Sequence, residues 1–257
     1  MARPIQALRE QATALEAALA VCVATPRKKA VHNLRTSTRR IEAQLELLMQ
    51  LRDLPPYRTE AAAFRRALKS NRKEAGQVRD LDVLQEILQG LRLPQPNHRQ
   101  KLLKALDKSR QKRADDLKQD LEQHIPKVAK AVEKLFAALK PAEGLTLPVR
   151  QLLPLADTWY QKRTRGMKVV REDDLHTIRK MAKVARYIAE TGLPAKQATT
   201  VAARYNRLQQ SGGHWHDALL LAQEAKKKLG KKDPLTKLTS ERAKTHHDSF
   251  VRLLNAA

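Results

Sequence analysis

Largely apolar helix faces recur along most of this chain, because hydrophobic residues repeat at spacings of three and four. Two clear examples are Val31, Leu34, Thr38, Ile41, Leu45 and Leu48, and Leu175, Ile178, Ala182, Ala185 and Ala189. Runs of β-branched or aromatic residues, which would favour a sheet, are few. The pattern therefore predicts an all-α protein.

Proline and glycine clusters divide the chain into helical lengths. The clusters are Pro26, Pro55-Pro56, Pro94-Gln95-Pro96, Pro141 to Gly144, Gly192-Leu193-Pro194, Ser211-Gly212-Gly213 and Gly230 to Pro234. They predict helices near residues 4–24, 26–52, 57–89, 97–139, 148–170, 172–191, 195–210, 213–229 and 234–255. The short connections favour antiparallel neighbours, and Pro126 and Pro154 are expected to kink their helices.

A cationic stripe occurs on two of these helices, to one side of the apolar face. The first stripe is Lys28, His32, Arg35 and Arg39, with Arg40 beside it; the second is His176, Arg179, Lys183 and Arg186, with Lys180 beside it. Stacked like charges destabilise a helix, so their repetition needs a reason. Because a guanidinium fork matches phosphate oxygens, we interpret the stripes as a phosphate site; the alternative is a charged face exposed to solvent.

Each half of the chain carries further cations. They are Arg65, Lys69, Arg72 and Arg79 in the first half, with Lys162, Arg163, Arg165 and Lys168 as their counterpart. Asp80 and Asp217 stand beside these groups, and we expect them to hold neighbouring Arg or His side chains; a catalytic or metal-binding carboxylate is the alternative. The histidines would strengthen anion binding as the pH falls through about 6.5, unless they are buried and neutral.

The two stripes belong to a weak internal duplication. His32, Arg35 and Arg39 align with His176, Arg179 and Lys183 at one constant offset, and Arg79-Asp80-Leu81 has a partner in His216-Asp217-Ala218. We therefore expect one domain over residues 1–257, with halves of about 1–142 and 143–257 that join near residues 140–146.

The charge balance narrows the class of partner. The net charge is +24 over 257 residues, which indicates a polyanion such as nucleic acid, inorganic polyphosphate or an anionic membrane surface. Cys22 is the single cysteine, expected as a buried residue in a reducing cytoplasm. Glu10 and Glu16 interrupt the early apolar stretch, so export is not expected. No apolar run has the length needed to span a bilayer. Among the polyanions we do not expect a membrane to be the partner.

The motifs together resemble the CHAD family, the conserved histidine α-helical domain. The residues that carry the resemblance are Val31-His32-Asn33-Leu34-Arg35 with Thr38-Arg39-Arg40, Gln77-Val78-Arg79-Asp80-Leu81-Asp82-Val83-Leu84, and Leu175-His176 through Arg179-Lys180 with Lys183 to Tyr187 and Glu190. The resemblance covers roughly residues 5–255. It departs from the family pattern at Gly212-Gly213-His214-Trp215-His216-Asp217, where the register of the second copy is open.

The resemblance implies two pseudo-symmetric antiparallel helical bundles around a central basic cavity, and inorganic polyphosphate as the ligand. It nominates His32, Arg35, Arg39, Lys69, Arg72, Arg79, His176, Arg179 and Lys183 for this site. It also links members to polyphosphate granules, which suggests polyphosphate-metabolising enzymes as further partners. We expect a non-catalytic, cytoplasmic binding protein that needs no cofactor.

Three other functions compete with this expectation. The charge fits a nucleic-acid-binding protein, but a helix-turn-helix signal, zinc-finger spacing and aromatic stacking platforms are missing. A phosphoanhydride enzyme would need a glycine-rich phosphate loop or an acidic cluster for Mg²⁺, and neither is recognisable. His214, His216, His246 and His247 invite a metal, yet no pair of them has the spacing of four that directs two rings to one ion.

Overall fold

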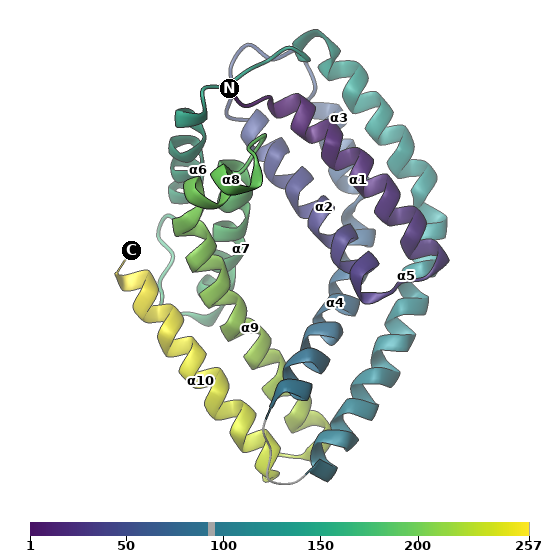
Figure 1. Cartoon of the computed structure of the whole chain (residues 1–257), viewed down its shortest axis with the longest axis vertical. Helices are drawn as coiled ribbons and strands as arrows, with labels where there is room; N and C mark the ends of the chain where they lie inside the picture. The colour runs from purple at the N-terminus through teal and green to yellow at the C-terminus, as the bar shows by residue number, and fades with distance from the viewer. Residues whose placement is uncertain (92–95, 257) are drawn as a thin grey trace.

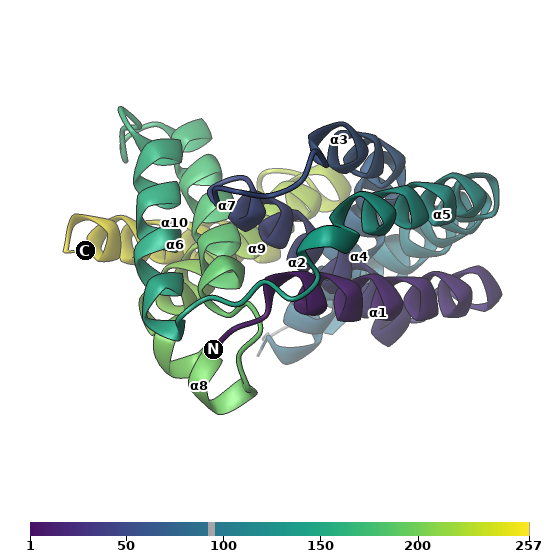
Figure 2. The same cartoon turned by 90° about the horizontal axis from the view of Figure 1, so that it is seen from above.

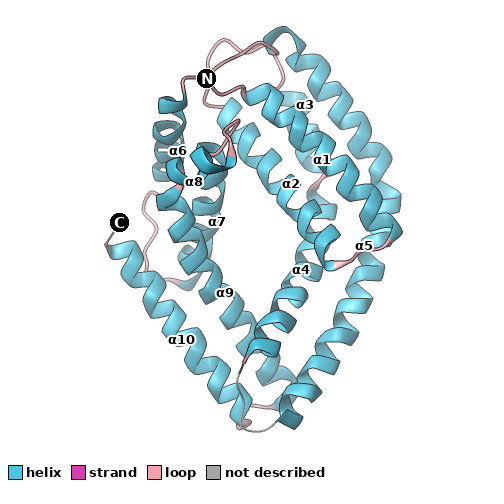
Figure 3. Ribbon diagram, viewed as in Figure 1, coloured by secondary structure: helices cyan, strands magenta, loops and turns pink. Residues whose placement is uncertain are grey.

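The computed structural model describes residues 1–91 and 96–256, and these residues form helices joined by short loops (Figure 3). The β pairing that they contain is an isolated antiparallel bridge between Ala2 and Leu147. The all-α prediction is confirmed. No helix among the described residues is long and apolar enough to cross a membrane.

The first group of helices runs from the N-terminus to the middle of the chain. Its bounds are α1 Pro4–Ala24, α2 Lys28–Leu48, α3 Arg58–Ala67, α4 Lys69–Gly90, α5 Pro96–Leu139 and the short 3₁₀ helix η1 Lys140–Ala142. The second group is α6 Val149–Thr164, α7 Glu172–Ala189, α8 Ala195–Val201, α9 Ala203–Leu229 and α10 Pro234–Asn255. Both α5 and α6 continue through an internal proline, Pro126 and Pro154.

Four helices face one another across the centre of the molecule. In Figure 1, α2 and α4 follow one side of the centre and α7 and α9 follow the other, while α5 and α10 form the outer edges. Seen from above, α2 lies between α7 and the other helices of the first group (Figure 2). The two helices that carry the predicted stripes are therefore neighbours.

The apolar faces predicted for α2 and α7 are buried. Val31, Leu34 and Leu45 of α2 are fully buried and pack with α1, α3 and α5 in the first core. Ala43 and Leu47, also on α2, join Ala182 and Ala185 of α7 in a second core. Burial of apolar surface on two sides fixes α2 between the groups and leaves a third side for its cations.

A further apolar cluster joins the two groups at their other end. It contains Leu84, Leu88 and Leu91 at the end of α4, Leu102 and Leu106 of α5, Leu221 and Ala225 of α9, and Leu235 of α10. The two groups are therefore held together both above and below the level at which the stripes lie.

The helix predicted over residues 57–89 is divided in the structure. In its place, α3 ends at Ala67, and α4 begins at Lys69 after the buried Leu68. No glycine or proline occurs at this point, so the sequence carries no local signal for the division. α3 packs on α5, whereas α4 packs on both α5 and α2. Tertiary packing therefore sets the boundary.

The predicted break at Ser211-Gly212-Gly213 is wrong, because α9 runs through these residues and the division lies at Ala202 instead. A Cβ atom on Gly212 would lie 2.8 Å from Cγ of Arg179 and 2.9 Å from Cζ of Phe250, whereas a Cβ on Gly213 would meet nothing within 4 Å. Gly212 is therefore a point of close helix packing and does not end a helix.

The remaining breaks fall close to the predicted clusters. The cluster at residues 94–96 is an exception, since Pro94 and Gln95 lie outside the described residues. α6 ends at Thr164, several residues before the predicted 170, and Gly166 follows with a φ of 78° that favours glycine. Cys22 is buried, as expected.

We predict that Gly212→Ala and Gly213→Ala have opposite effects on stability. The first introduces an overlap with Arg179 and Phe250 and should destabilise the fold by about 1–3 kcal/mol. The second adds a helix-favouring residue in open space and should stabilise it by roughly 0.5–1 kcal/mol. Urea unfolding followed by circular dichroism measures both. Equal effects of the two substitutions would contradict the close packing at Gly212.

Candidate functional site

A cavity of about 190 Å³ lies where α2, α4, α7 and α9 face one another. Its lining comes from all four helices and consists of His32, Arg35, Thr36, Arg79, Asp80, Val83, Arg179, Lys183, Gln209, Gly213, His216 and Asp217. Four of these residues are arginine or lysine and two are carboxylic acids. The cavity is therefore polar, and cations predominate in it.

The helices of the first group place Arg35 and Arg79 in this cavity. Arg35 extends from α2 across α4, where a Cβ atom on Gly76 would lie 2.7 Å from its Nη1. Its guanidinium forms an ion pair with Asp80 at 3.3 Å. Arg79 forms an ion pair with Glu86 at 3.3 Å on the same helix. The glycine provides the room that lets the Arg35 side chain lie against α4.

The second group repeats this arrangement with Arg179 of α7 on Gly212 of α9. The stem of Arg179 crosses the glycine, and burial lowers the pKa of its guanidinium. The Nε atom of Arg179 is buried and has no hydrogen-bond partner. A buried donor without a partner is unfavourable, so this atom is ready to bind an acceptor.

Lys183 lies one turn after Arg179 on α7 and is the most strongly perturbed cation of the site. Burial lowers the pKa of Lys183 to about 8, and the charges of Arg35, Arg39 and Arg179 act in the same direction. No ion pair of Lys183 occurs within the described part of the chain. An anion in the cavity would relieve this repulsion.

The histidines at the site are held toward the neutral form. Burial, with the charges of Arg79 and Lys183, lowers the pKa of His32. Burial beside Arg179 and His176 lowers the pKa of His216 to about 3. Any gain in anion affinity from protonation therefore requires a pH below 6.5, in contrast to the simple expectation from the sequence.

The two acids of the cavity differ in their surroundings. Asp80 pairs with Arg35, as the sequence analysis expected. Burial raises the pKa of Asp217, although the nearby Arg179 acts in the opposite direction. Both acids offset part of the local positive charge, and Asp80 holds the guanidinium of Arg35 in place before any ligand arrives.

The structure brings about half of the predicted residues together. His32, Arg35, Arg79, Arg179 and Lys183 line the cavity. Arg39 and Arg72 adjoin it through Glu42, which accepts ion pairs from both at 3.7 and 2.7 Å. Arg186 reaches the same region, since it donates a hydrogen bond of 2.8 Å to Gln209.

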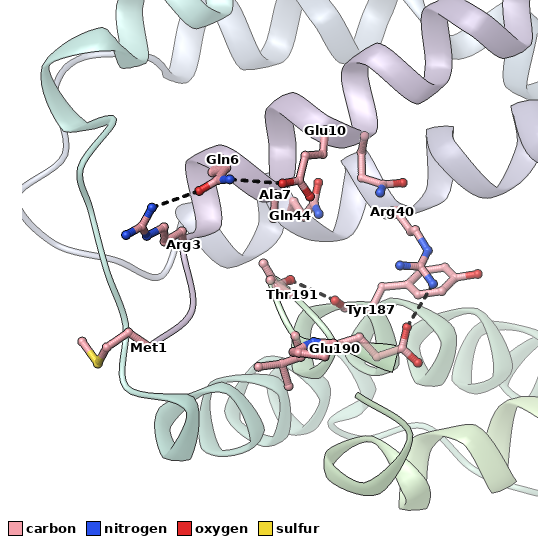
Figure 4. Close-up of a pocket in the computed structure, with 14 residues that line it drawn as sticks. Met1, Arg3, Gln6, Ala7, Glu10, Arg40, Gln44, Tyr187, Glu190 and Thr191 are labelled. Carbon is pink, nitrogen blue, oxygen red and sulfur yellow. Dashed lines mark hydrogen bonds and ion pairs between the residues drawn. The ribbon is translucent and has the colours of Figure 1, made fainter. Parts of the chain in front are cut away.

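Arg40 points to a different pocket, of about 350 Å³, between α1, α2 and the end of α7 (Figure 4). Its guanidinium lies over the ring of Tyr187, 5.1 Å from the centroid, and donates to Glu190 at 3.4 Å. Because Glu190 also accepts from Arg186 at 2.6 Å, Arg40 connects α2 to α7 as a structural contact. The sequence placed Arg40 with the stripe, but it is one residue too far around the helix to line the cavity.

The other predicted residues do not line the cavity. Lys69, Lys162, Arg165 and Lys180 are exposed, Lys28 is exposed and lies 4.0 Å from Glu86, Arg65 pairs with Glu46 at 2.9 Å, and His176 stacks on Trp215 at 4.5 Å. In the second half, the histidine of the cavity is His216 and not His176. The alignment of Arg79-Asp80 with His216-Asp217 already contained this signal.

Gln209 and Thr36 are lining residues that the sequence analysis missed. No sequence signal distinguished them, because an uncharged polar residue on a helix is usually exposed. Outside the cavity, His176 and His247 contact the ring of Trp215, and His214 and His246 have ring centroids 5.7 Å apart. No group of three potential metal ligands occurs in the described residues.

Comparison with known proteins identifies this arrangement of helices. The CHAD domain profile matches residues 6–226. The fold is similar to the crystal structure of the CHAD domain from the plant Ricinus communis, with a TM-score of 0.66 and 18% identity over 97% of this chain and 89% of the other. It is also similar to PptA from Streptomyces chartreusis, with a TM-score of 0.68 and 16% identity over 99% of this chain and 100% of the other. No curated protein sequence matches significantly.

We predict that His216 makes stability depend on pH. Its pKa is about 3 in the folded protein and near 6.5 in an unfolded chain, so below pH 6.5 the unfolded state binds a proton that the folded state excludes. Above pH 6.5 His216 therefore does not lower the free energy of unfolding. As the pH drops from 6.5 toward 3, protonation of the unfolded state lowers this free energy by up to about 1.4 kcal/mol per pH unit.

Urea unfolding at pH 7.5 and pH 5 measures this dependence. His216→Asn should reduce the difference in unfolding free energy between the two pH values. The matched control is His214→Asn, which removes an exposed imidazole from the same helix and should leave the difference unchanged. The interpretation fails if the two variants behave alike.

Proposed function

The chain belongs to the CHAD domain family, and we propose that it binds inorganic polyphosphate in the cavity between α2, α4, α7 and α9. The observation that carries this proposal is the convergence of Arg35, Arg79, Arg179 and Lys183 from three different helices on one space. Association of CHAD domains with polyphosphate supports the same ligand.

The unsatisfied groups of the cavity favour an anionic ligand rich in acceptors. The buried Nε of Arg179 lacks a partner, and Lys183 has no ion pair among the described residues. Phosphate oxygens accept hydrogen bonds from guanidinium and ammonium groups, and such charge-assisted bonds are stronger than neutral ones. Bound phosphate would also reduce the repulsion between Arg179 and Lys183.

A chain of phosphates fits the extent of the cationic surface better than a single phosphate does. Arg39 and Arg72, which share the partner Glu42, extend the cationic surface beyond the cavity on one side. Lys28 and Arg79, which both pair with Glu86, extend it on the other side. A flexible polyanion that follows α2 would contact all of these groups in turn, and affinity would rise with its length until the stripe is filled.

Nucleic acid is the second candidate, and the lining of the cavity is less suited to it. The residues that line the cavity include no Phe, Tyr or Trp, whereas proteins that hold single strands stack the bases on aromatic rings. A polymer of phosphates has no bases and needs only cations. We therefore propose that polyphosphate is preferred over DNA or RNA at an equal concentration of phosphate.

The proposed role is binding without catalysis. Asp80 forms an ion pair with Arg35, and the positive charge of Arg179 acts on Asp217. Neither acid is therefore a free general base or an obvious Mg²⁺ ligand. Localisation at polyphosphate granules, or delivery of polyphosphate to an enzyme that metabolises it, would follow from binding alone.

We predict that incubation with long-chain polyphosphate and Mg²⁺ releases no inorganic phosphate above the level of a heat-treated sample. A molybdate assay measures the release over several hours. Steady release that depends on protein concentration, and that is lost on substitution of Asp80 or Asp217 by Asn, would show an enzyme instead.

We predict that the paired substitution Arg79→Gln and Lys183→Gln weakens binding of defined-length polyphosphate by roughly 100-fold, because two charge-assisted contacts are lost. The slope of log affinity against log salt concentration should fall by about 1.5, as expected for two lost phosphate contacts. Isothermal titration calorimetry at three salt concentrations measures both quantities.

The matched control is Lys162→Gln with Arg165→Gln, two exposed cations outside the cavity. It changes the net charge by the same amount, so a general electrostatic effect would weaken both variants equally. The proposal predicts a change of less than about threefold for the control, because neither side chain contacts the ligand in the cavity. Displacement of bound polyphosphate by DNA at equal phosphate concentration would favour the nucleic-acid alternative.

A further inference from the structure

Lys183 combines two properties that together favour a reaction at its amine. Its side chain lines the cavity, and the charges of four arginines act on it: Arg35, Arg39, Arg179 and Arg186. The first property makes the amine reachable by a small molecule. The second surrounds it with groups that bind phosphate.

We propose that Lys183 is a modification site for acyl phosphates, the mixed anhydrides of a carboxylic acid and phosphoric acid. The phosphate group of such a molecule would be held by Arg35 and Arg179. Its acyl carbon would then lie next to the amine of Lys183. The cavity, at about 190 Å³, suits small acyl groups better than large ones.

The reactive form of a lysine is the neutral amine. Lys183 has a pKa of about 8, compared with an ordinary value near 10.5, because burial and the neighbouring arginines disfavour the ammonium. In the empty cavity at pH 8 about half of Lys183 is therefore neutral, roughly 100-fold more than an exposed lysine at that pH, and burial, the largest cause, persists when a phosphate binds. The other titratable or charged groups that line the cavity, His32, Arg79, Asp80, His216 and Asp217, lie on its other three helices.

The proposed step transfers the acyl group and releases phosphate. The Nζ lone pair of Lys183 attacks the carbonyl carbon and forms the C–N bond of an amide. The C–O bond to phosphate breaks, and its electron pair leaves with the phosphate, which the arginines stabilise as a dianion. The proton that the amine loses passes to the departing phosphate, which is thereby released as HPO4²⁻, and no oxidant or other reactant is required.

The consequence for the site rests on the proposed function. An acylated Lys183 carries no positive charge, so polyphosphate would bind more weakly. Bound polyphosphate would in turn occupy the arginines and protect the amine. The fraction of the protein that is acylated at Lys183 would then depend on the relative concentrations of polyphosphate and acyl phosphates.

The experiment uses acetyl phosphate as the probe and the exposed Lys180, on the same helix, as the internal reference. The full-length protein is incubated with acetyl phosphate at pH 8, and acetylation at each lysine is quantified by peptide mass spectrometry. We expect Lys183 to be acetylated at least about tenfold faster than Lys180, given its larger neutral fraction. Equal rates at the two lysines would overturn the proposal.

A neutral reagent separates phosphate recognition from simple reactivity. N-acetoxysuccinimide has no phosphate, so the preference for Lys183 over Lys180 should fall at least threefold with this reagent. An unchanged preference would overturn the role of the arginines. Arg179→Gln should likewise reduce acetylation by acetyl phosphate, while Lys183→Arg should abolish the modified peptide and keep the fold.

The two proposals fail in different ways. If polyphosphate binds by calorimetry but acetyl phosphate does not favour Lys183, the modification site is wrong and the proposed function stands. If Lys183 is favoured but polyphosphate neither binds nor slows acetylation, the proposed function is wrong. Protection by polyphosphate at a concentration that saturates binding supports both.

Discussion

The repulsion between cations on α2 and α7 is the constraint on which the rest of this structure depends. Burial, together with the charges of neighbouring arginines, lowers the pKa of Arg39, Arg179 and Lys183. Apolar burial opposes the repulsion: Ala43 and Leu47 of α2 share a core with Ala182 and Ala185 of α7. A second cluster joins α4, α5, α9 and α10 at the other end. The site is therefore a region of unfavourable electrostatics held in place by packing on both sides of it.

Acidic residues reduce the repulsion between these cations but do not neutralise all of them. Glu42 is shared by Arg39 and Arg72, Asp80 pairs with Arg35, and Glu190 accepts from Arg40 and Arg186. These pairs fix the directions of the arginine side chains, but they leave Lys183 and the Nε of Arg179 without a partner among the described residues. An anion that binds there would stabilise the folded state in proportion to its own affinity, since an unfolded chain offers no such convergence.

Periodicity made the helices and the two cationic faces predictable. A helix that buries one face and exposes another has a repeating pattern in its own sequence, which can be read without knowing the helices it packs against. Gly212 shows the limit of this reasoning. Its sequence neighbours suggest a loop, and only the positions of Arg179 and Phe250 explain a glycine inside a helix. The division at Leu68, the turn of Arg40 toward Tyr187, and the exchange of His176 for His216 in the cavity depend likewise on which helices meet. Charge alone could not separate Lys162 and Arg165, which are exposed, from Lys183, because the difference lies in the tertiary environment.

The central claim is that these opposed helices hold one phosphate chain between them. Diffraction from crystals grown with tripolyphosphate tests it most directly. The account predicts connected density for the three phosphorus atoms inside the cavity, with oxygen atoms within hydrogen-bond distance of Arg35, Arg179 and Lys183. An empty cavity at saturating ligand, with phosphate ordered only against exposed lysines such as Lys162, would contradict it.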